Sequence, residues 1–386
     1  MMRHMVRARI LDVLYKLEIL LLVTLPLCAV VVAVVYWWNS YVFATDMILF
    51  SVMFLIAMFG STIGYHRYLT HQGFVCGPVL KALLVIAGCT AFEGRPLDWV
   101  PTHIKHHAYS DEDDDPHSPL HGFFHAHVGW IFNPRSFAHP KEYAPHLLQD
   151  PVILWADHLY LLWMALSLAI PFALGGWTAL VWAGGVRIFL NTHITYSVNS
   201  VCHTFGKRAF LTTDESRNEW VVGLLAFGEG WHNNHHAFPR NAFHGMRWWQ
   251  FDLSGLVIRG LEKTGLVWDV QRVSVEVQEA QKNRAQSMWS ALQELRQSAL
   301  SSIAAARTQW TESAATYMQS VSESQLDQWQ EIQMDSVKRL DDMQAAIARS
   351  AHLKRAKLLQ YQREAERLMN DVKRRYGAVT GSMASA

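Results

Sequence analysis

Apolar residues gather in long runs in the first half of the chain, whereas the last third is polar, charged and rich in Gln, Ser and Ala. Two pairs of these runs are each about as long as a helix that crosses the hydrocarbon core of a bilayer. The second pair is joined only by Gly175 and Gly176, which predicts a tight turn between two helices. The pattern therefore predicts two helical hairpins, with spans at about residues 17–38, 42–63, 152–174 and 177–198.

Basic residues predict the orientation of these spans. They precede the first span and fill the long loop between the hairpins, whereas the short loops after the first and third spans contain none. Cytoplasmic loops of membrane proteins carry an excess of Lys and Arg, so both termini and the long loop are predicted to be cytoplasmic. The residues concerned are Arg3, Arg7, Arg9, Lys16, Arg67, Lys81, Arg95, Lys105, Arg135 and Lys141.

The remaining segments divide the chain into a cap and a tail. Residues 64–151 and 199–265 are predicted to form a helical cytoplasmic cap on the membrane domain 17–265, after a cytoplasmic N-terminus 1–16. Residues 266–376 contain neither Gly nor Pro, which is typical of long helices, so the tail 266–386 is predicted to be helical. Self-association of this tail, a solvated helical hairpin and a partly disordered extension all remain open. Five apolar residues follow heptad spacing, but two heptads are fewer than the three or four that indicate a coiled coil: Leu358, Tyr361, Ala365, Leu368 and Val372.

Nine of the 20 histidines follow a pattern that requires a chemical explanation. They occur as HRYLTH just past the second span, as HIKHH in the long loop, as HNNHH after the fourth span, and in NSVCH at the end of that span. All are predicted to lie at one face of the membrane. The nine are His66 and His71, His103, His106 and His107, His203, and His232, His235 and His236.

This spacing favours metal binding. On a helix, residues at i, i+3 and i+4 share a face, so an HxxHH triplet is expected to direct three imidazoles at one volume. Neutral imidazole binds iron, copper, nickel and zinc, and nine imidazoles are enough for two ions. Carboxylates that orient such ligands are expected nearby, and Asp115 and Glu229 are the candidates. His117 is expected as a loop residue or a hydrogen-bond donor behind the ligands, and His244 is given no role.

At these residues the chain resembles the membrane fatty acid desaturases, in particular the acyl-CoA delta-9 (stearoyl-CoA) type and its bacterial members. The three histidine motifs occur in the order and at the spacing of that family. DPHSPLHGFFHAHVGW, NSVCH and DESRNEWVVGLLAFGEGWHNNHH extend the resemblance, which covers roughly residues 20–270. It does not cover the tail.

The resemblance implies an all-α membrane protein whose cytoplasmic cap holds two iron ions on the nine histidines, with Asn199 reaching one iron through water. It also implies a bent tunnel for the acyl chain, with Trp99 and Thr195 at its kink. Relatives commonly have Gln six residues before that Trp, and here Glu93 occupies the position. This difference leaves the contacts at the kink undetermined.

The implied reaction is the O2-dependent insertion of a cis double bond into a saturated acyl-CoA in the bacterial inner membrane, or in the ER membrane of a eukaryote. An unactivated methylene has no acidic proton, so oxygen activated on a metal is the plausible oxidant. The alternatives are an acyl-lipid desaturase, a lipid or alkane hydroxylase, and a metal transporter. No haem, flavin or ferredoxin motif is present, so electrons are expected from a reductase with ferredoxin, rubredoxin or cytochrome b5. The near-neutral net charge of +1 gives no indication of a nucleic-acid partner.

Overall fold

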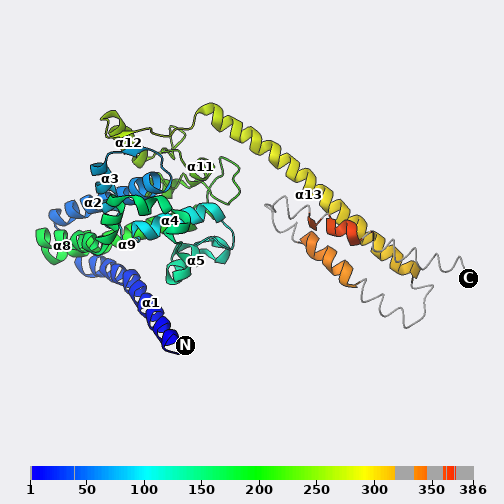
Figure 1. The fold of residues 1–386 in the computed structure, drawn as a ribbon, viewed down its shortest axis with the longest axis horizontal. Helices are drawn as coiled ribbons and strands as arrows, with labels where there is room; N and C mark the ends of the chain where they lie inside the picture. The colour runs from blue at the N-terminus through cyan, green and yellow to red at the C-terminus, as the bar shows by residue number, and fades with distance from the viewer. Residues whose placement is uncertain are drawn as a thin grey trace, which may run out of the picture. The chain divides into compact units, whose positions relative to one another are not determined.

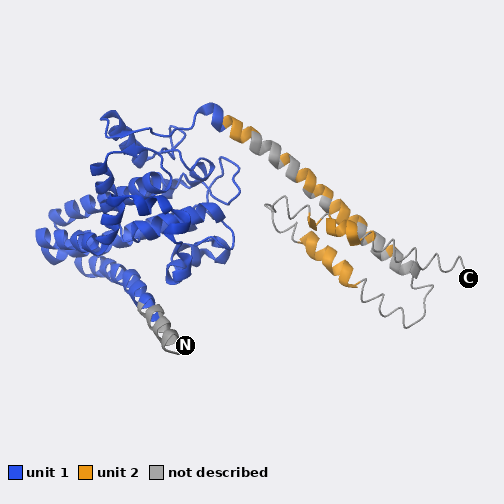
Figure 2. Cartoon of the chain, viewed as in Figure 1, with its two compact units in different colours: residues 1–278 blue, residues 279–386 orange. Residues whose placement is uncertain are grey.

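A computed structural model describes the backbone of residues 2–38, 40–317, 334–345, 360–361, 363–368 and 370. The chain divides into two compact units, Met1–Gln278 and Glu279–Ala386 (Figure 2). Helices dominate unit 1, as the all-α prediction requires, and a single two-stranded sheet is present among the described residues.

The elements of unit 1 follow one another as in Figure 1. The first half contains α1 (Met2–Val31), η1 (Val32–Trp37), α2 (Ala44–Phe59), η2 (Gly60–Thr70), β1 (Val75–Cys76), α3 (Pro78–Cys89), α4 (Pro96–Tyr109), η3 (Pro119–His121), α5 (Phe123–His127), η4 (Gly129–Phe132), η5 (Pro134–Ser136), α6 (Pro140–Tyr143) and η6 (Pro145–Gln149). The second half contains α7 (Pro151–His158), α8 (Tyr160–Ala179), η7 (Leu180–Val186), α9 (Arg187–Ser200), α10 (Trp220–Leu225), α11 (His232–Ala237), α12 (Leu253–Lys263) and β2 (Val267–Trp268). A long helix, α13 (Val275–Tyr317), begins at the end of unit 1.

Three helical segments among the described residues are long and apolar enough to cross a membrane: Tyr15–Trp37, Ala44–Thr70 and Tyr160–Ser200. The third has 41 residues and is interrupted at Gly176, whose φ of 68° and ψ of −152° are not helical. The two predicted spans 152–174 and 177–198 thus form one long segment with a break at the expected turn. α2 contacts α8, η7 and α9, so both parts of that segment pack against it.

The predicted start of the third span at residue 152 is wrong. Residues 151–158 form the separate helix α7, which ends where Leu159 leaves helical geometry. Asp157 in α7 is buried, accepts a hydrogen bond from the backbone N–H of Leu97 at 3.2 Å and forms an ion pair with Arg95. These contacts hold α7 against α4, because a buried carboxylate needs such partners. The apolar segment that can enter a bilayer therefore begins at Tyr160.

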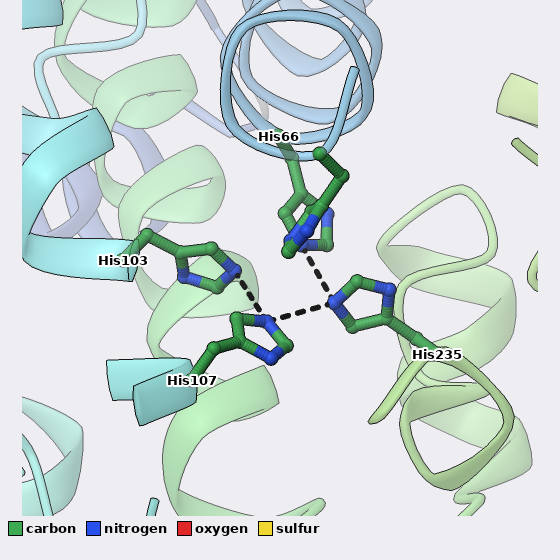
Figure 3. Close-up of side chains that lie close together, drawn as sticks. His66, His103, His107 and His235 are labelled. Carbon is green, nitrogen blue, oxygen red and sulfur yellow. Dashed lines mark hydrogen bonds between the residues drawn. The ribbon is translucent and has the colours of Figure 1, made fainter. Parts of the chain in front are cut away.

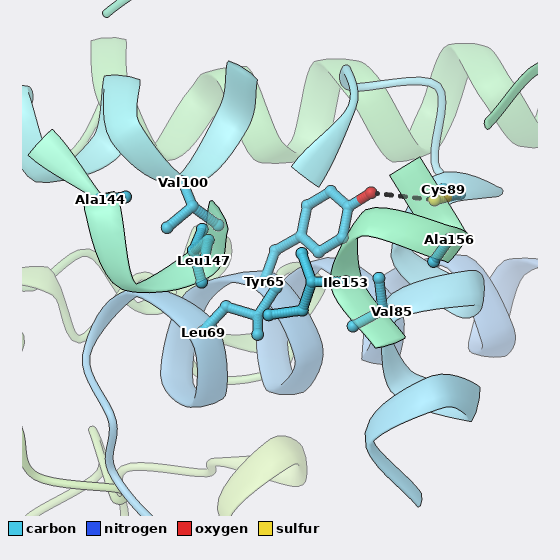
Figure 4. Packing of buried hydrophobic residues seen from close by; sticks show 9 residues of the cluster. All are labelled: Tyr65, Leu69, Val85, Cys89, Val100, Ala144, Leu147, Ile153 and Ala156. Carbon is cyan, nitrogen blue, oxygen red and sulfur yellow. Dashed lines mark hydrogen bonds between the residues drawn. The ribbon is translucent and has the colours of Figure 1, made fainter. Parts of the chain in front are cut away.

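A buried apolar cluster joins the second span to the cap (Figure 4). The Tyr65 ring lies at its centre, fully buried, and its hydroxyl donates to Cys89 Sγ at 3.3 Å. Its other members come from η2, α3, α4, α7 and the chain between α6 and α7: Leu69, Val85, Cys89, Val100, Ala144, Leu147, Ile153 and Ala156. The cluster fixes η2, which carries the first histidines, against α4, which carries the next three.

The chain enters the tail later than predicted. Residues 267–268 are the strand β2, paired antiparallel with β1 in the register Val75 to Trp268. The backbone N–H of Gln271 then donates to Gly73 O at 2.8 Å, so this segment belongs to unit 1. The expectation of a helix from residue 266 is wrong, because α13 begins at Val275.

Unit 2 has buried apolar positions of its own: Ile303, Leu340, Met343 and Ala365. Of the apolar heptad positions, Leu358 and Val372 lie outside the described residues. Self-association through the tail stays a prediction.

Close contact between η2 and α3 depends on small residues. A Cβ on Gly60 would lie 2.1 Å from the backbone carbonyl carbon of Ala87, and one on Gly64 would lie 2.6 Å from Leu84 O. Both neighbours are backbone atoms, so neither can yield by a rotamer change. Glycine at these positions lets two apolar helices approach as closely as small-residue motifs allow in membranes.

We expect Gly60→Ala to force η2 away from α3 and to lower the apparent Tm of the purified protein by roughly 5 °C, since overpacking typically costs about 1–3 kcal/mol. Gly77→Ala is the matched control, because a Cβ there meets nothing within 4 Å. A thermal shift assay in detergent measures both. Equal Tm values for the two variants would contradict this account of the packing.

Candidate metal centre

The spacing of the first histidine pair is explained by a π-helix. His66 lies in η2, and the backbone N–H of His71 donates to His66 O at 3.1 Å, a bond between residues five apart. In an α-helix, with 3.6 residues per turn, positions five apart point about 140° away from each other. The wider turn brings both rings to one side, with centroids 4.8 Å apart. π-helical turns frequently mark functional sites.

The nine predicted histidines come together in two groups. Within each group, one ring nitrogen per residue lies within 4.8 Å of those of all other members. The first group is His66, His71, His103, His107 and His235, and the second is His106, His203, His232 and His236. Four segments far apart in the sequence contribute: η2, α4, the turn after α9, and α11.

Each HxxHH triplet is divided between the two groups, so the expectation that a triplet serves one volume is wrong. In α4, His103 and His107 join the first group and His106 joins the second. In α11, His232 and His236 join the second group and His235 joins the first. The i, i+4 pair stays together in both helices. The third histidine diverges because adjacent helical residues point about 100° apart.

Ring nitrogens of the first group face one another (Figure 3). His235 Nε2 lies 3.1 Å from His66 Nε2 and 3.0 Å from His107 Nε2, while His103 Nε2 lies 3.2 Å from His107 Nε2. A neutral ring nitrogen carries either one proton or one lone pair, so His235 cannot hydrogen-bond to both neighbours through one nitrogen. A cation at the centre, bound by all the lone pairs, would satisfy these contacts together.

Carboxylates determine the position of the proton in four of the nine rings. Each carboxylate accepts a hydrogen bond from Nδ1 of its histidine, which leaves Nε2 with a lone pair for a metal. The pairs are His66 with Glu229 at 2.6 Å, His106 with Asp115 at 2.9 Å, His203 with Asp111 at 3.0 Å, and His236 with Asp214 at 2.8 Å. The contacts expected of Asp115 and Glu229 are present. Asp111 belongs to the acidic run 111–115 that directly follows HIKHH, in which Asp115 is the favoured candidate. Asp214 was missed, because nothing in its spacing relates it to a histidine.

Burial holds six of the nine rings neutral. Burial, followed by the repulsion of neighbouring imidazoles, keeps the pKa well below its usual range in five of them: His71, His103, His107, His232 and His235. Burial also lowers the pKa of His106 to about 3, although Asp115 opposes the shift. At neutral pH these side chains are therefore lone-pair donors, the form that binds metals.

A buried ion-pair network contacts the first histidine group through Glu229, the partner of His66. Arg67, predicted as one of the cytoplasmic loop cations, is instead buried in η2. Its guanidinium donates to both carboxylate oxygens of Asp252, at 2.9 and 3.1 Å, and to Glu229 at 3.1 Å. His244 Nδ1 lies 3.1 Å from Glu229 as well. The sequence did not predict this contact of His244. His117, which is expected as a loop residue or a donor behind the ligands, has its Nδ1 3.7 Å from Asp115 Oδ1, which is too far for a hydrogen bond.

A small cavity of about 60 Å³ lies beside both histidine groups. Trp99, Thr195 and Asn199 line it, together with His66, His103 and His232. The Trp99 ring stacks on His103 with centroids 5.0 Å apart. Trp99 and Thr195, predicted at the kink of the tunnel, and Asn199, predicted to reach a metal through water, therefore line the same cavity. Their roles stay predictions.

Glu93 is a buried acid in the wall of this cavity. Thr195 donates to it at 2.7 Å, Asn191 at 2.8 Å and Ser61 at 2.6 Å. Burial raises the pKa of Glu93 to about 7, and the hydrogen bonds moderate the shift. The carboxyl, in the loop between α3 and α4, therefore links two helical segments, η2 and α9, at the cavity.

The donor set fits a metal centre of nitrogen ligands. His71 Nε2, His106 Nε2 and His236 Nε2 are buried and have no hydrogen-bond partner among the described residues. Buried polar atoms without a partner are costly unless a ligand satisfies them. Imidazole sets of this kind suit iron, copper or zinc.

Comparison with known proteins identifies the family. Residues 47–259, more than half of the chain, match the family described as fatty acid desaturase. The chain belongs to the fatty acid desaturase family. It is accordingly an oxidoreductase with the histidine clusters and membrane-type helices of such enzymes.

Similar desaturase-family proteins differ in the carrier that their names give. A hex-5-enoyl-[acyl-carrier protein] acetylenase of Moorena producens is 38% identical over 67% of this chain and 87% of its own length. An acyl-CoA C20 Delta5-desaturase of Anemone leveillei is 36% identical, over 61% of this chain and 74% of its own. An sn-1 stearoyl-lipid 9-desaturase of Anabaena variabilis is 41% identical, over 55% and 78%.

The carboxylates behind the rings generate a prediction. We expect Asp214→Asn to weaken iron binding by about 10–100-fold, because the amide cannot polarise His236 Nδ1–H as a carboxylate does. Iron per chain, measured by mass spectrometry during chelator titration, reports the change. Glu215→Gln is the control, as the adjacent acid pairs with Arg217 rather than with a histidine. Equal iron retention in the two variants would refute the role of Asp214.

Proposed function

We propose that this chain inserts a cis double bond, at the delta-9 position, into a saturated acyl-CoA in an O2-dependent reaction. The proposal is carried by one observation: nine buried or half-buried imidazoles form two adjacent groups of five and four beside a cavity. Two groups of this size are what a pair of ions requires. Family membership supports the reaction class.

We assign one iron ion to each histidine group. His66, His71, His103, His107 and His235 would hold the first, and His106, His203, His232 and His236 the second, with Asn199 linked through water. Bound iron supplies the O2-dependent chemistry that abstracting hydrogen from an unactivated methylene needs. The chain's own contribution is to keep six of the rings neutral, to orient four rings through Glu229, Asp115, Asp111 and Asp214, and to position the acyl chain.

Trp99, Thr195 and Glu93 are proposed to position that acyl chain. The cavity of about 60 Å³ has room for only a few water molecules, so a fatty acyl chain would have to displace side chains to enter. Trp99 is packed on His103, so its placement sets the distance between substrate and metal ligands. Holding a methylene at a fixed distance is how such a site would select one carbon.

Four crossings of the bilayer are proposed for the membrane domain. A straight helix of 41 residues would be roughly 60 Å long, twice the thickness of a hydrocarbon core. The break at Gly176 divides Tyr160–Ser200 near its middle, which allows two crossings. Basic residues favour cytoplasmic termini and a cytoplasmic metal centre. Electrons would then come from a soluble donor on that side.

The alternative substrate is an acyl chain on a membrane lipid. The Anabaena relative, named as a stearoyl-lipid desaturase, favours this reading, whereas the Anemone relative is named for acyl-CoA. A hydroxylase would leave oxygen in the product. The carrier, the double-bond position and the oxygen content of the product are therefore what experiments must determine.

Expression in a desaturase-deficient host, with and without O2, tests the function directly. We expect a new monounsaturated fatty acid only with O2, and two irons per chain in the purified protein. Pulse labelling should place the new double bond in the acyl-CoA pool before the phospholipid pool. A hydroxylated product, zinc in place of iron in active protein, or a product formed without O2 would each contradict the proposal.

Replacing one ligand of each group tests the metal assignment. We expect His106→Ala and His235→Ala each to abolish desaturation while the protein remains in the membrane, since each removes a nitrogen from one group. His158→Ala, an exposed histidine at the end of α7, should keep full activity. Product analysis and membrane fractionation measure both properties. Near-normal turnover in either ligand variant would remove that residue from the centre.

A further inference from the structure

A second cavity, whose lining contains no histidine, lies beside α10 and the start of α11 in unit 1. It encloses about 770 Å³, a size typical of ligand sites. Apolar and aromatic side chains supply most of its wall: Phe210, Trp220, Leu224, Trp231, Trp249 and Phe251. None of these residues has a part in the proposed reaction.

The position of α10 places this cavity at the level of the membrane. The buried side of α10 and the residues after it, including Val222 and Phe227, packs against α2. Phe227 contacts Phe54 and Phe59, with centroids 5.9 and 5.1 Å apart, in the segment that we propose crosses the bilayer. The opposite side of α10 therefore faces outward at the depth of lipid.

That outward side is apolar, although it is exposed. Trp220 is 66% exposed and Leu224 52% exposed, and both line the cavity. Trp248 and Trp249, 96% and 55% exposed, continue the surface. Exposed aromatic residues of this kind gather where proteins meet the polar boundary of a bilayer.

Charge distinguishes this cavity from a merely apolar groove. The cavity is lined by three basic side chains, Lys207, Arg208 and Arg247, and by one carboxylate, Glu219. Glu219 caps α10, because it accepts a hydrogen bond from the backbone N–H of Val222 at 2.8 Å. Arg208 is occupied by Thr212, at 2.9 Å, and by Glu215. Lys207 and Arg247 are exposed and form no ion pair within the part of the chain that the structure describes. Two cations are thus free to bind an anion.

We propose that this cavity binds a phospholipid with a net negative headgroup, drawn from the surrounding membrane. Its phosphate would lie at Lys207 and Arg247, and an acyl chain would pack along Trp220, Leu224 and Trp249. Anionic headgroups attract Lys and Arg at the membrane surface, and a phospholipid presents a phosphate and an acyl chain together there. The inference rests on the membrane placement proposed above, not on the reaction.

Native mass spectrometry of the full chain in neutral detergent tests the proposal, with dioleoyl-phosphatidylglycerol and dioleoyl-phosphatidylcholine as probes. We expect the anionic lipid to bind at least about tenfold more tightly. Lys207→Glu with Arg247→Glu should remove this preference. Arg135→Glu with Lys141→Glu, the same charge change at exposed positions outside the cavity, should keep it. Trp249→Ser should weaken binding of both lipids.

Equal binding of the two lipids by the unmodified protein would overturn the proposal, and so would equal loss of preference in the two charge-reversed variants. Displacement of the anionic lipid by palmitoyl-CoA or by glycerol phosphate at the same concentration would assign the cavity to a soluble anion instead. If the Glu variant does not fold, Lys207→Gln with Arg247→Gln provides the comparison. Desaturation is measured on the same samples, so loss of lipid preference with turnover intact would leave the proposed function standing.

Discussion

The candidate centre depends on the pairing of buried imidazoles with buried carboxylates. A carboxylate at Nδ1 determines which ring nitrogen carries the proton, and so directs the lone pair of Nε2 inward. Three of the four rings in the second group have such a partner, whereas in the first group only His66 has one. Arg67 compensates on that side by binding Glu229 and Asp252 in one buried network. The same contacts that prepare the rings for a metal therefore also hold η2, α11 and α12 together.

The histidines could be selected from sequence because their spacing is local, but their division into two groups could not. Residues 103, 106 and 107 lie within one helical turn, and sequence alone does not show that 100° of rotation separates two targets. The HxxxxH spacing of His66 and His71 likewise makes sense only once η2 is seen to be a π-helix. In both cases the motif identified the candidate ligands, and the helix geometry determined which of the two histidine groups each of them joins.

Long-range partners account for most of what the sequence did not predict. Asp111 and His203 are 92 residues apart, and Asp214 lies in a turn with no regular pattern. Arg67 resembles a loop cation until its buried carboxylates are seen, since charge counting cannot distinguish a paired arginine from a free one. The third span was placed too early for a related reason. Ile153 and Ala156 of α7 pack into the buried apolar cluster around Tyr65, and apolar composition does not distinguish burial in protein from burial in lipid.

The cavity and the metal centre share one rigid frame, and Glu93 connects its parts. Its two oxygens accept hydrogen bonds from η2 through Ser61 and from α9 through Asn191 and Thr195. Trp99, which also lines the cavity, is stacked on the candidate ligand His103. A shift of η2 or α9 would therefore strain a buried polar contact at the cavity. Because a buried acid without these donors would be costly, the three hydrogen bonds stabilise the separation of η2 and α9 at the cavity. Under the proposed function, that separation would set which part of an acyl chain reaches the histidines.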